Sequence, residues 1–528
     1  MASPAALRLL AALAAGVLLA FAFPPSGGPA FLLALPFAFA LIASAPGARA
    51  AAATGAAFAV GFFALHLAWL PVAFSALLSP FFWVTFPFLL AALAVYWAAA
   101  AAGARFLGGA GGGALLVLAP LWVGVELLRS VGFLGFPWGT LGYAWVGTPV
   151  AQWADLIGVH GLSLATTAAA AALAAPFVAR LGSGRRGSTG GFGGGRGGGT
   201  PWLAPLATVA LMIAAWTGGT ARETAIATSL EPPDRTALLV QGNVDPFGRA
   251  ISPRQELDVH LDLTAAGALR AGEAPDLVVW PEGAVLGFPL EGFRGEPARA
   301  AIEASAPGAT FVVGGRGTAE GGGTNAVYLL REGQVHGRYD KHVLVPFGER
   351  WPLLQAAAPL YRAVFGLLNL PMLQNTVAGP GPTPLAPDDA ALGAYVCYES
   401  VFPRIARGMV ADGAQVLINV TNDAWFGRGI GAAQHHSMGT LRAIETRRWL
   451  LRAGNDGITA VVDPTGRTVE RAPQGTEATL SVRYAQRDDR TPYVRFGGAV
   501  PWVVLGLTVA AVAASAAGRD RAPIGARR

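Results

Sequence analysis

Long apolar segments fill the N-terminal part of the chain and return near its C-terminus. An α-helix of about 20 apolar residues crosses the hydrocarbon layer of a bilayer. Segments of about this length predict seven membrane-spanning helices before residue 219 and an eighth after residue 496. The predicted spans are 7–23, 29–45, 54–76, 81–102, 113–131, 159–180, 202–218 and 497–517.

Between residues 219 and 496 the pattern changes to short β-branched runs that alternate with helical segments. This alternation is typical of an α/β domain in which helices cover a buried sheet. The segment 346–390, rich in Pro, Leu and aromatic residues, is interpreted as an insertion or a lid, with the membrane surface as one place for it to lie. Strands are predicted at 236–241, 276–280, 310–314, 325–330, 391–397, 415–420 and 458–462, and helices near 253–271, 295–306, 402–412 and 432–452.

These patterns divide the chain into three parts. Residues 1–218 form a predicted seven-helix membrane domain, which includes a flexible Gly/Arg-rich cytoplasmic loop at 182–200. Residues 219–496 form the α/β domain. Residues 497–528 hold the eighth helix and a basic cytoplasmic tail.

The composition agrees with a membrane protein, and the distribution of the charges shows that the positive net charge does not indicate nucleic-acid binding. Of the 528 residues, 53% are hydrophobic and 13% are charged, whereas soluble domains carry about 25% charged residues. A net charge of +6 would fit nucleic-acid binding if it lay on the α/β domain. Residues 219–496, however, hold 26 basic and 29 acidic residues, while 1–218 hold eight basic and two acidic ones. The basic excess flanks the spans, so no nucleic-acid partner is expected.

The positions of the basic residues predict the orientation of the spans. Arg8 precedes the first span, Arg49 lies between the second and third, and Arg105 follows the fourth, whereas the connections around 24–28 and 71–80 carry no basic residue. Basic connections stay in the cytoplasm. We therefore expect a multi-pass membrane protein with both termini cytoplasmic and the α/β domain outside. A signal peptide cleaved after the first segment would put this pattern out of phase.

Two residue types occur only once and are the strongest candidates for chemistry. Lys341 is the single Lys among 38 basic residues, and a compact ammonium can stabilise an oxyanion where the bulky guanidinium of Arg cannot. Cys397 is the only Cys and follows a predicted strand, so it fits either a nucleophile or a buried core residue. Glu282, at another strand end, fits either a helix cap or a general base. One Cys excludes intramolecular disulfides and Cys-rich metal sites.

Two further groups of polar residues have open interpretations. Glu126 and Arg129 lie three positions apart in the fifth predicted span, where ionisable residues are either functional or form a self-neutralising pair. His435 and His436 are adjacent, and adjacent side chains on a helix do not face one metal ion. No metal or cofactor is therefore predicted.

At these positions the chain resembles the nitrilase superfamily, whose active sites hold a Glu-Lys-Cys triad. The matching motifs are Trp280-Pro281-Glu282, the segment 339–349 that contains Lys341 and ends in Phe347-Gly348-Glu349, and Cys397-Tyr398-Glu399, with further matches at 135–138, 240–243 and 421–427. With eight predicted spans and the α/β domain between the last two, the whole chain is similar to the bacterial apolipoprotein N-acyltransferase family.

This resemblance implies a protein of the bacterial inner membrane with an αββα catalytic domain and a two-step acyl transfer without a cofactor. Glu282 would deprotonate Cys397, whose thiolate takes an acyl chain from a phospholipid while Lys341 stabilises the oxyanion. The thioester would then acylate the N-terminal α-amine of a diacylglyceryl-cysteine lipoprotein, and the enzyme is expected to be a monomer. The resemblance gives supporting or substrate-binding roles to Glu349, Tyr398, Glu399, Trp425 and Phe426. Residues 244–247 lack the Trp expected in the family's first periplasmic loop.

Two alternatives remain at this point. A membrane-tethered nitrilase-like amidase would use the same triad with water as the acceptor. A transporter or receptor would use the outer domain only for binding, so that replacing Cys397 would not abolish its function.

Overall fold

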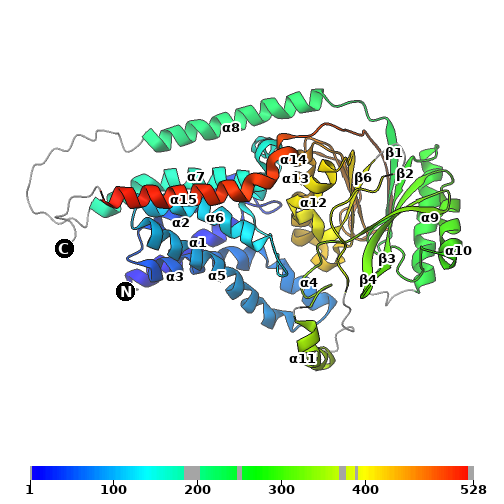
Figure 1. Cartoon of the computed structure of the whole chain (residues 1–528), viewed down its shortest axis with the longest axis horizontal. Helices are drawn as coiled ribbons and strands as arrows, with labels where there is room; N and C mark the ends of the chain where they lie inside the picture. The colour runs from blue at the N-terminus through cyan, green and yellow to red at the C-terminus, as the bar shows by residue number, and fades with distance from the viewer. Residues whose placement is uncertain are drawn as a thin grey trace, which may run out of the picture.

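The protein consists of a bundle of apolar helices joined to a sandwich of two β-sheets (Figure 1). The computed structural model describes residues 3–183, 203–245, 252–351, 353–367, 376–386 and 391–520. Most of the predicted Gly/Arg-rich loop 182–200 and part of the predicted insertion 346–390 lie outside the described residues.

Each predicted span corresponds to helical structure, but the helices differ in length. Among the described residues, six helical segments are long and apolar enough to cross a membrane, and two more, Pro4–Ala20 and Pro29–Ala43, are shorter. The predicted span 54–76 is wrong as one helix, because it is divided between two helices; Pro71 lies in the first turn of the second, where Pro is tolerated. The helices are α1 (Pro4–Ala20), α2 (Ala34–Ala43), α3 (Ala48–His66), α4 (Trp69–Leu77), α5 (Phe82–Gly108), α6 (Gly112–Arg129), α7 (Ala154–Ser183), α8 (Leu203–Thr228) and α15 (Val500–Asp520).

Glycines allow α1 and α3 to approach each other closely. A Cβ atom at Gly16 would lie 2.0 Å from the carbonyl oxygen of Phe58, and one at Gly61 would lie 2.1 Å from that of Leu13. Small residues at such crossings let helix backbones pack in direct contact, which is how membrane helices commonly associate. The first helix is therefore an integral part of the bundle.

The α/β domain has two sheets. One has six strands in the order β11-β1-β2-β3-β4-β5, and the other has five in the order β10-β9-β8-β7-β6. Helices α9 (Pro253–Ala271) and α10 (Glu296–Ser305) cover the first sheet, and α12 (Pro403–Ala411) and α13 (Ala432–Thr446) cover the second, on the side of the membrane helices (Figure 1). The strands are β1 (Arg235–Gln241), β2 (Leu277–Val279), β3 (Thr310–Ala319), β4 (Gly322–Arg331), β5 (Gln334–Asp340), β6 (Leu392–Val396), β7 (Val416–Thr421), β8 (Leu450–Gly454), β9 (Ala460–Val462), β10 (Thr468–Arg471) and β11 (Ala478–Tyr484).

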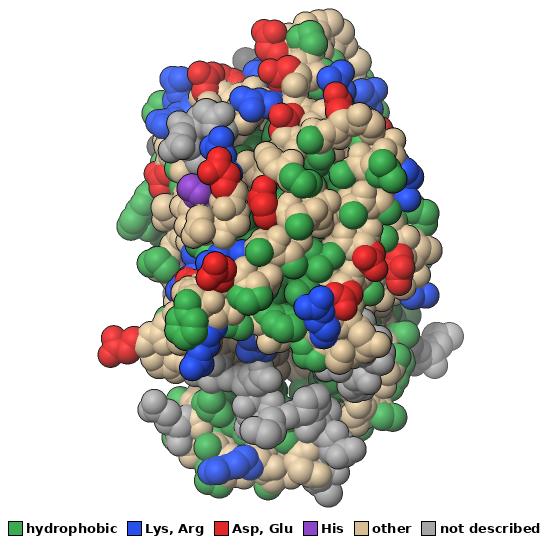
Figure 2. Space-filling model, turned by 90° about the vertical axis from the view of Figure 1, so that its right-hand side faces the viewer, with side chains coloured by type: hydrophobic (Ala, Val, Ile, Leu, Met, Phe, Trp, Pro, Cys, Tyr) green, Lys and Arg blue, Asp and Glu red, His purple; other side chains and the backbone are tan. Residues whose placement is uncertain are grey.

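Alternating side chains on β1 explain how the layers hold together. Ala237 and Leu239 belong to the core between the sheets, whereas Leu238 and Val240 belong to a second core that includes Leu257 of α9. A strand with both faces buried is apolar along its whole length. The outer face of this domain shows acidic and basic side chains interspersed with apolar ones (Figure 2). The predicted αββα arrangement is confirmed.

The predicted helix 432–452 is wrong at its C-terminal end. Helix α13 stops at Thr446, and Arg447 adopts a left-handed conformation with a φ of 52°. The apolar run after it forms β8, which pairs in parallel with β7. Periodicity alone does not separate a short buried strand from the end of a helix. Strands β5, β10 and β11 and the helices α11 (Leu354–Leu367) and α14 (Pro492–Phe496) were not predicted.

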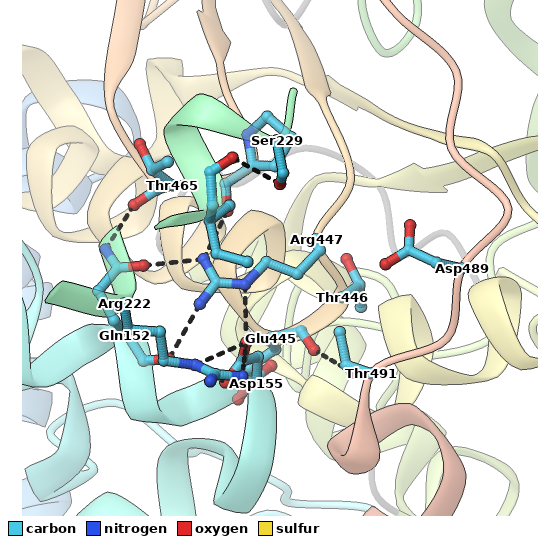
Figure 3. A network of polar contacts seen from close by, with 12 residues as sticks. Gln152, Asp155, Arg222, Ser229, Glu445, Thr446, Arg447, Thr465, Asp489 and Thr491 are labelled. Carbon is cyan, nitrogen blue, oxygen red and sulfur yellow. Dashed lines mark hydrogen bonds and ion pairs between the residues drawn. The ribbon is translucent and has the colours of Figure 1, made fainter. Parts of the chain in front are cut away.

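A buried ionic network joins the two parts of the protein (Figure 3). The Nε atom of Arg447 donates to Oδ2 of Asp155 on α7 at 2.9 Å, and Arg222 of α8 donates to the same oxygen at 2.7 Å. Gln152 accepts from Arg447 at 2.8 Å and donates to the carbonyl oxygen of Thr465 at 2.8 Å. Asp155 and Gln152 of the membrane part thus bind Arg447 at the end of α13, and Arg222 shares the Asp155 carboxylate.

We expect Asp155→Ala to destabilise the protein strongly, because it leaves the buried Arg447 guanidinium without its counterion. Losing one partner of a buried pair costs about 3–5 kcal/mol, and the thermal unfolding midpoint of the detergent-solubilised protein measures this loss. Asp258→Ala is the control, because it breaks an exposed pair with Arg254 and should change stability by less than about 1 kcal/mol. Equal midpoints for the two variants would contradict a joining role for Asp155.

Candidate active site

Three strand ends bring Glu282, Lys341 and Cys397 together. Glu282 lies three residues after β2, Lys341 directly follows β5, and Cys397 directly follows β6. The Nζ atom of Lys341 lies 3.4 Å from Oε1 of Glu282. Cys397 lies close enough to both for their charges to act on its thiol. Residues from both sheets therefore converge at one point.

Cys397 occupies a sharp turn between β6 and a 3₁₀ turn that spans Cys397–Val401. Its φ of 47° is in the left-handed region, which L-residues other than Gly, Asn and Asp seldom adopt. The carbonyl oxygen of Cys397 lies 3.0 Å from Nε2 of His435, which also contacts Ser400 Oγ at 2.7 Å. Such conformations persist where the surroundings hold them, commonly at functional sites.

The Cys397 thiol is protonated at neutral pH. Burial raises its pKa above the ordinary value, and the negative charge of Glu282 raises it further, while the ammonium of Lys341 opposes both. Because the thiolate is the nucleophilic form of a cysteine, this thiol needs a base at the moment of attack. Glu282 is the carboxylate placed beside it.

Lys341 is a buried cation held by two carboxylates. Its side chain is 1% exposed, and Nζ lies 2.9 Å from Glu349 as well as 3.4 Å from Glu282. Burial alone would lower the pKa of Lys341, but the charges of Glu349 and Glu282 raise it above the ordinary value. The ammonium therefore stays charged at all physiological pH values.

Asn325 of β4 organises both carboxylates, and sequence reasoning missed it. Its Nδ2 donates to Oε1 of Glu282 at 2.7 Å and to Oε1 of Glu349 at 2.8 Å. The backbone carbonyl oxygen of Asn325 accepts from the backbone N–H of Lys341 at 2.8 Å. Asn is unfavourable inside a strand, so its place within an apolar run was the signal available in the sequence.

Glu399 joins the turn of Cys397 to the segment after Lys341. This buried carboxylate accepts from Tyr339 Oη at 2.7 Å, from the backbone N–H groups of His342 and Val343 at 2.8 and 3.0 Å, and from that of Val396 at 2.8 Å. Four donors for one carboxylate fix the relative positions of β5 and β6 at the site.

The other candidate residues lie where the site meets the membrane part. Tyr398 donates its hydroxyl to the carbonyl oxygen of Gly135 at 2.8 Å. The ring of Phe426 lies 5.5 Å from that of Trp138, and the ring of Trp425 lies 6.3 Å from that of Phe74 on α4. Aromatic side chains of both parts thus pack around the turn that carries Cys397.

Glu126 and Arg129 each bind the loop that reaches this contact. Glu126 accepts from the backbone N–H of Leu141 at 2.8 Å, and Arg129 donates to the carbonyl oxygens of Phe136 and Trp138 at 3.0 and 3.1 Å. The side chain of Arg129 also lies over an aromatic ring of α5. Both buried charges therefore hold the loop that contacts Tyr398 and Phe426.

The two adjacent His residues have separate environments. His435 is buried and contacts Asp423 at 2.9 Å, whereas His436 contacts Thr468 at 3.1 Å. Although burial favours the neutral acid, Arg452 and His435 hold the pKa of Asp423 below its ordinary value. Within the described ranges, no three His, Cys, Asp or Glu side chains are grouped as metal ligands would be.

Comparison with known proteins identifies two family models that match different parts of the chain. The carbon-nitrogen hydrolase family model matches residues 236–491, and the model of the apolipoprotein N-acyltransferase N-terminal domain matches residues 15–172. The apolipoprotein N-acyltransferase of Azotobacter vinelandii is 33% identical over 514 residues, which cover 95% of this chain and 93% of the relative. That of Caulobacter vibrioides is 33% identical over 512 residues, covering 92% and 90%. A solved amidase of the nitrilase superfamily from Nesterenkonia sp. AN1 is 20% identical with a TM-score of 0.37, over 50% of this chain and 95% of that chain.

The fold and the family matches define a nitrilase-like carbon-nitrogen hydrolase domain joined to a membrane domain. The chain belongs to the apolipoprotein N-acyltransferase family, and it is an acyltransferase. Neither the amidase alternative nor the binding or transport alternative is better supported than this assignment.

We expect alkylation of Cys397 by iodoacetamide to be slow at pH 6 and to accelerate up to pH 9. Because the pKa of the thiol is raised, the thiolate fraction grows about tenfold per pH unit throughout this range. Intact-mass measurement is unambiguous, since the chain has one Cys. A rate that levels off below pH 8 would show a thiol that is already ionised.

Proposed function

We propose that Glu282, Lys341 and Cys397 transfer an acyl chain from a phospholipid to the N-terminal α-amine of a diacylglyceryl-cysteine lipoprotein. The observation that carries this proposal is that Cys397, Glu282 and the buried ammonium of Lys341 meet at three strand ends, with Lys341 Nζ 3.4 Å from Glu282. The resulting thioester is reactive toward amines, and a buried site favours aminolysis over hydrolysis.

In the first half-reaction Glu282 takes the proton of the Cys397 thiol, and the sulfur attacks the ester carbonyl carbon. Lys341 stabilises the negative oxygen of the tetrahedral intermediate. The ester C–O bond then breaks, and the departing lysophospholipid oxygen receives the proton from Glu282. The acyl chain remains on the sulfur as a thioester.

In the second half-reaction the α-amine attacks the thioester carbonyl and loses a proton to Glu282. The C–S bond breaks, an amide forms, and the proton returns to the sulfur of Cys397. Glu349 and Asn325 position Lys341 and Glu282, while Glu399 positions the turn of Cys397. Tyr398, Trp425 and Phe426 form the aromatic wall on the membrane side.

The domain boundaries and orientation belong to the same proposal. Residues 1–218 and 497–528 form the inner-membrane part with eight spans, and residues 219–496 lie outside the cytoplasm. The start of α1 and the end of α15 lie at the same end of the bundle, away from the sheets (Figure 1), which supports placing both termini in the cytoplasm. The enzyme acts as a monomer.

Incubating the solubilised protein with phospholipid and measuring its intact mass tests the first half-reaction. We expect an added acyl mass in the native chain and none in Cys397→Ala. Adding a diacylglyceryl-cysteine peptide should discharge the adduct and yield an N-acylated peptide. The absence of any adduct with every lipid tried would refute the proposal, while discharge to free fatty acid alone would favour the amidase.

We expect Lys341→Arg to lower the rate of adduct formation at least about a hundredfold, the loss typical of one oxyanion donor. The variant keeps the charge but replaces a compact ammonium by a larger planar group, in a position where the native side chain is 1% exposed. An unchanged thermal midpoint separates this effect from misfolding. Turnover near that of the native enzyme would contradict the role given to Lys341.

A further inference from the structure

His435 of α13 lies directly behind the turn that carries Cys397, and the acyl transfer proposed above gives it no role. Its side chain is fully buried. Its Nε2 atom lies 3.0 Å from the carbonyl oxygen of Cys397 and 2.7 Å from Oγ of Ser400. One imidazole ring therefore contacts the turn of the nucleophile at two positions.

A buried ion pair holds the other side of this ring. Nη2 of Arg452 donates to Oδ2 of Asp423 at 2.7 Å, and neither side chain is exposed. The same Nη2 lies 3.0 Å from Nδ1 of His435, and Oδ1 of Asp423 lies 2.9 Å from that nitrogen. The Thr421 hydroxyl and the backbone N–H of Ile458 also donate to the Asp423 carboxylate, at 3.0 and 3.2 Å. Supporting contacts of this kind lock the rotamer of the side chain that they surround.

The partners of the two ring nitrogens place the proton of His435 on Nε2. Burial and the charge of Arg452 lower the pKa of His435, so the ring carries one proton at neutral pH. Because a guanidinium only donates, Nδ1 accepts from Arg452, and Oδ1 of Asp423 accepts from the same guanidinium. Because a carbonyl oxygen only accepts, Nε2 donates to Cys397.

Aromatic side chains from both parts of the protein fix the plane of the ring. The ring of Phe426 lies 4.7 Å from that of His435, and the ring of Trp138 is stacked on it at 6.0 Å. The preceding residue, Gln434, accepts from the indole N–H groups of Trp69 and Trp138 at 2.9 and 2.8 Å. The first turn of α13 therefore contacts the membrane part and the turn of Cys397 at the same place.

The backbone at Cys397 needs support of this kind. Its φ of 47° is unfavourable for a residue that has a Cβ atom. In a trans peptide the carbonyl group and the following N–H point in opposite directions, so a donor that fixes the Cys397 carbonyl also fixes the N–H of Tyr398. Without that donor the turn can relax toward an ordinary conformation, which would move the thiol relative to Glu282 and Lys341.

We infer that His435 is a positioning residue: its Nε2–H holds the carbonyl group of Cys397 and so keeps the thiol aligned with Glu282 and Lys341. The inference rests on the proposed function and adds to it a residue that acts through Cys397. Asp423 and Arg452 act in turn through His435, because they fix its tautomer and the orientation of its ring.

Two substitutions separate the roles of the two ring nitrogens. The side-chain nitrogen of Gln is as many bonds from Cβ as Nε2 of His, and that of Asn is as many bonds from Cβ as Nδ1. His435→Gln therefore keeps a donor toward Cys397, whereas His435→Asn keeps a group only toward Asp423.

The experiment measures, by intact mass, the rate constant of acyl-adduct formation on the full chain in detergent. Mixed micelles of phosphatidylethanolamine and phosphatidylglycerol supply the acyl chain at several concentrations. The rate constant describes only the folded molecules, so a loss of stability lowers the final amount of adduct without changing it.

We expect His435→Asn to lower the rate constant about a hundredfold, the effect of misplacing a reacting group by about 1 Å. The lipid concentration that gives half the maximal rate should stay unchanged, because His435 acts on the thiol. His435→Gln should stay within about tenfold of the native rate constant, as expected when one hydrogen bond is weakened but kept.

His436→Asn is the matched control, since it makes the same substitution at the next position of α13, where the ring contacts Thr468. It should keep the native rate constant. If His435→Asn reacts as fast as His435→Gln, or loses only the final amount of adduct, the positioning role is overturned while the proposed function stands. Failure of the native chain to form an adduct would overturn the proposed function and this inference together.

Discussion

The buried ammonium of Lys341 is the constraint on which the rest of the site depends. A cation that is 1% exposed is tolerated only when carboxylates surround it, and Glu282 and Glu349 fill that requirement. The positions of both carboxylates must also be fixed, and the side chain of Asn325 does this by donating a hydrogen bond to each of them. The same carboxylate that neutralises the ammonium thereby lies beside the thiol. The contacts that stabilise the buried ammonium of Lys341 are therefore the same contacts that place Glu282 beside the thiol.

The catalytic domain is bound to the membrane helices through two different kinds of contact. Near the site the contact is mostly aromatic, with Trp138 packed against Tyr398 and Phe426. At the end of α13 it is ionic, with Arg447 bound to Asp155. Because the helices that cover the second sheet face the bundle, the turn that carries Cys397 lies beside the membrane part, where Tyr398 binds Gly135.

The sequence points more clearly to the groups proposed to react than to the groups that position them. Lys341 and Cys397 stand out because each is the only residue of its type, and Glu282 stands out at a strand end. Asn325 gives a weaker signal, because its importance depends on two carboxylates that lie 43 and 24 residues away in the chain. The layers of the domain follow from apolar runs. The position at which α13 ends does not follow from the apolar pattern. Leu450 and its neighbours form a strand because they pair with β7.

The solitary thiol also has a redox consequence. Oxidation of Cys397 to a sulfenic acid is not followed by an internal disulfide, because the chain contains no second Cys to resolve it. Protection of the Cys397 thiol against oxidation must therefore come from its surroundings in the site. Burial to 4% exposure and a protonated resting state both slow attack by oxidants. The protonated state that makes a base necessary is thus also the state that resists oxidation.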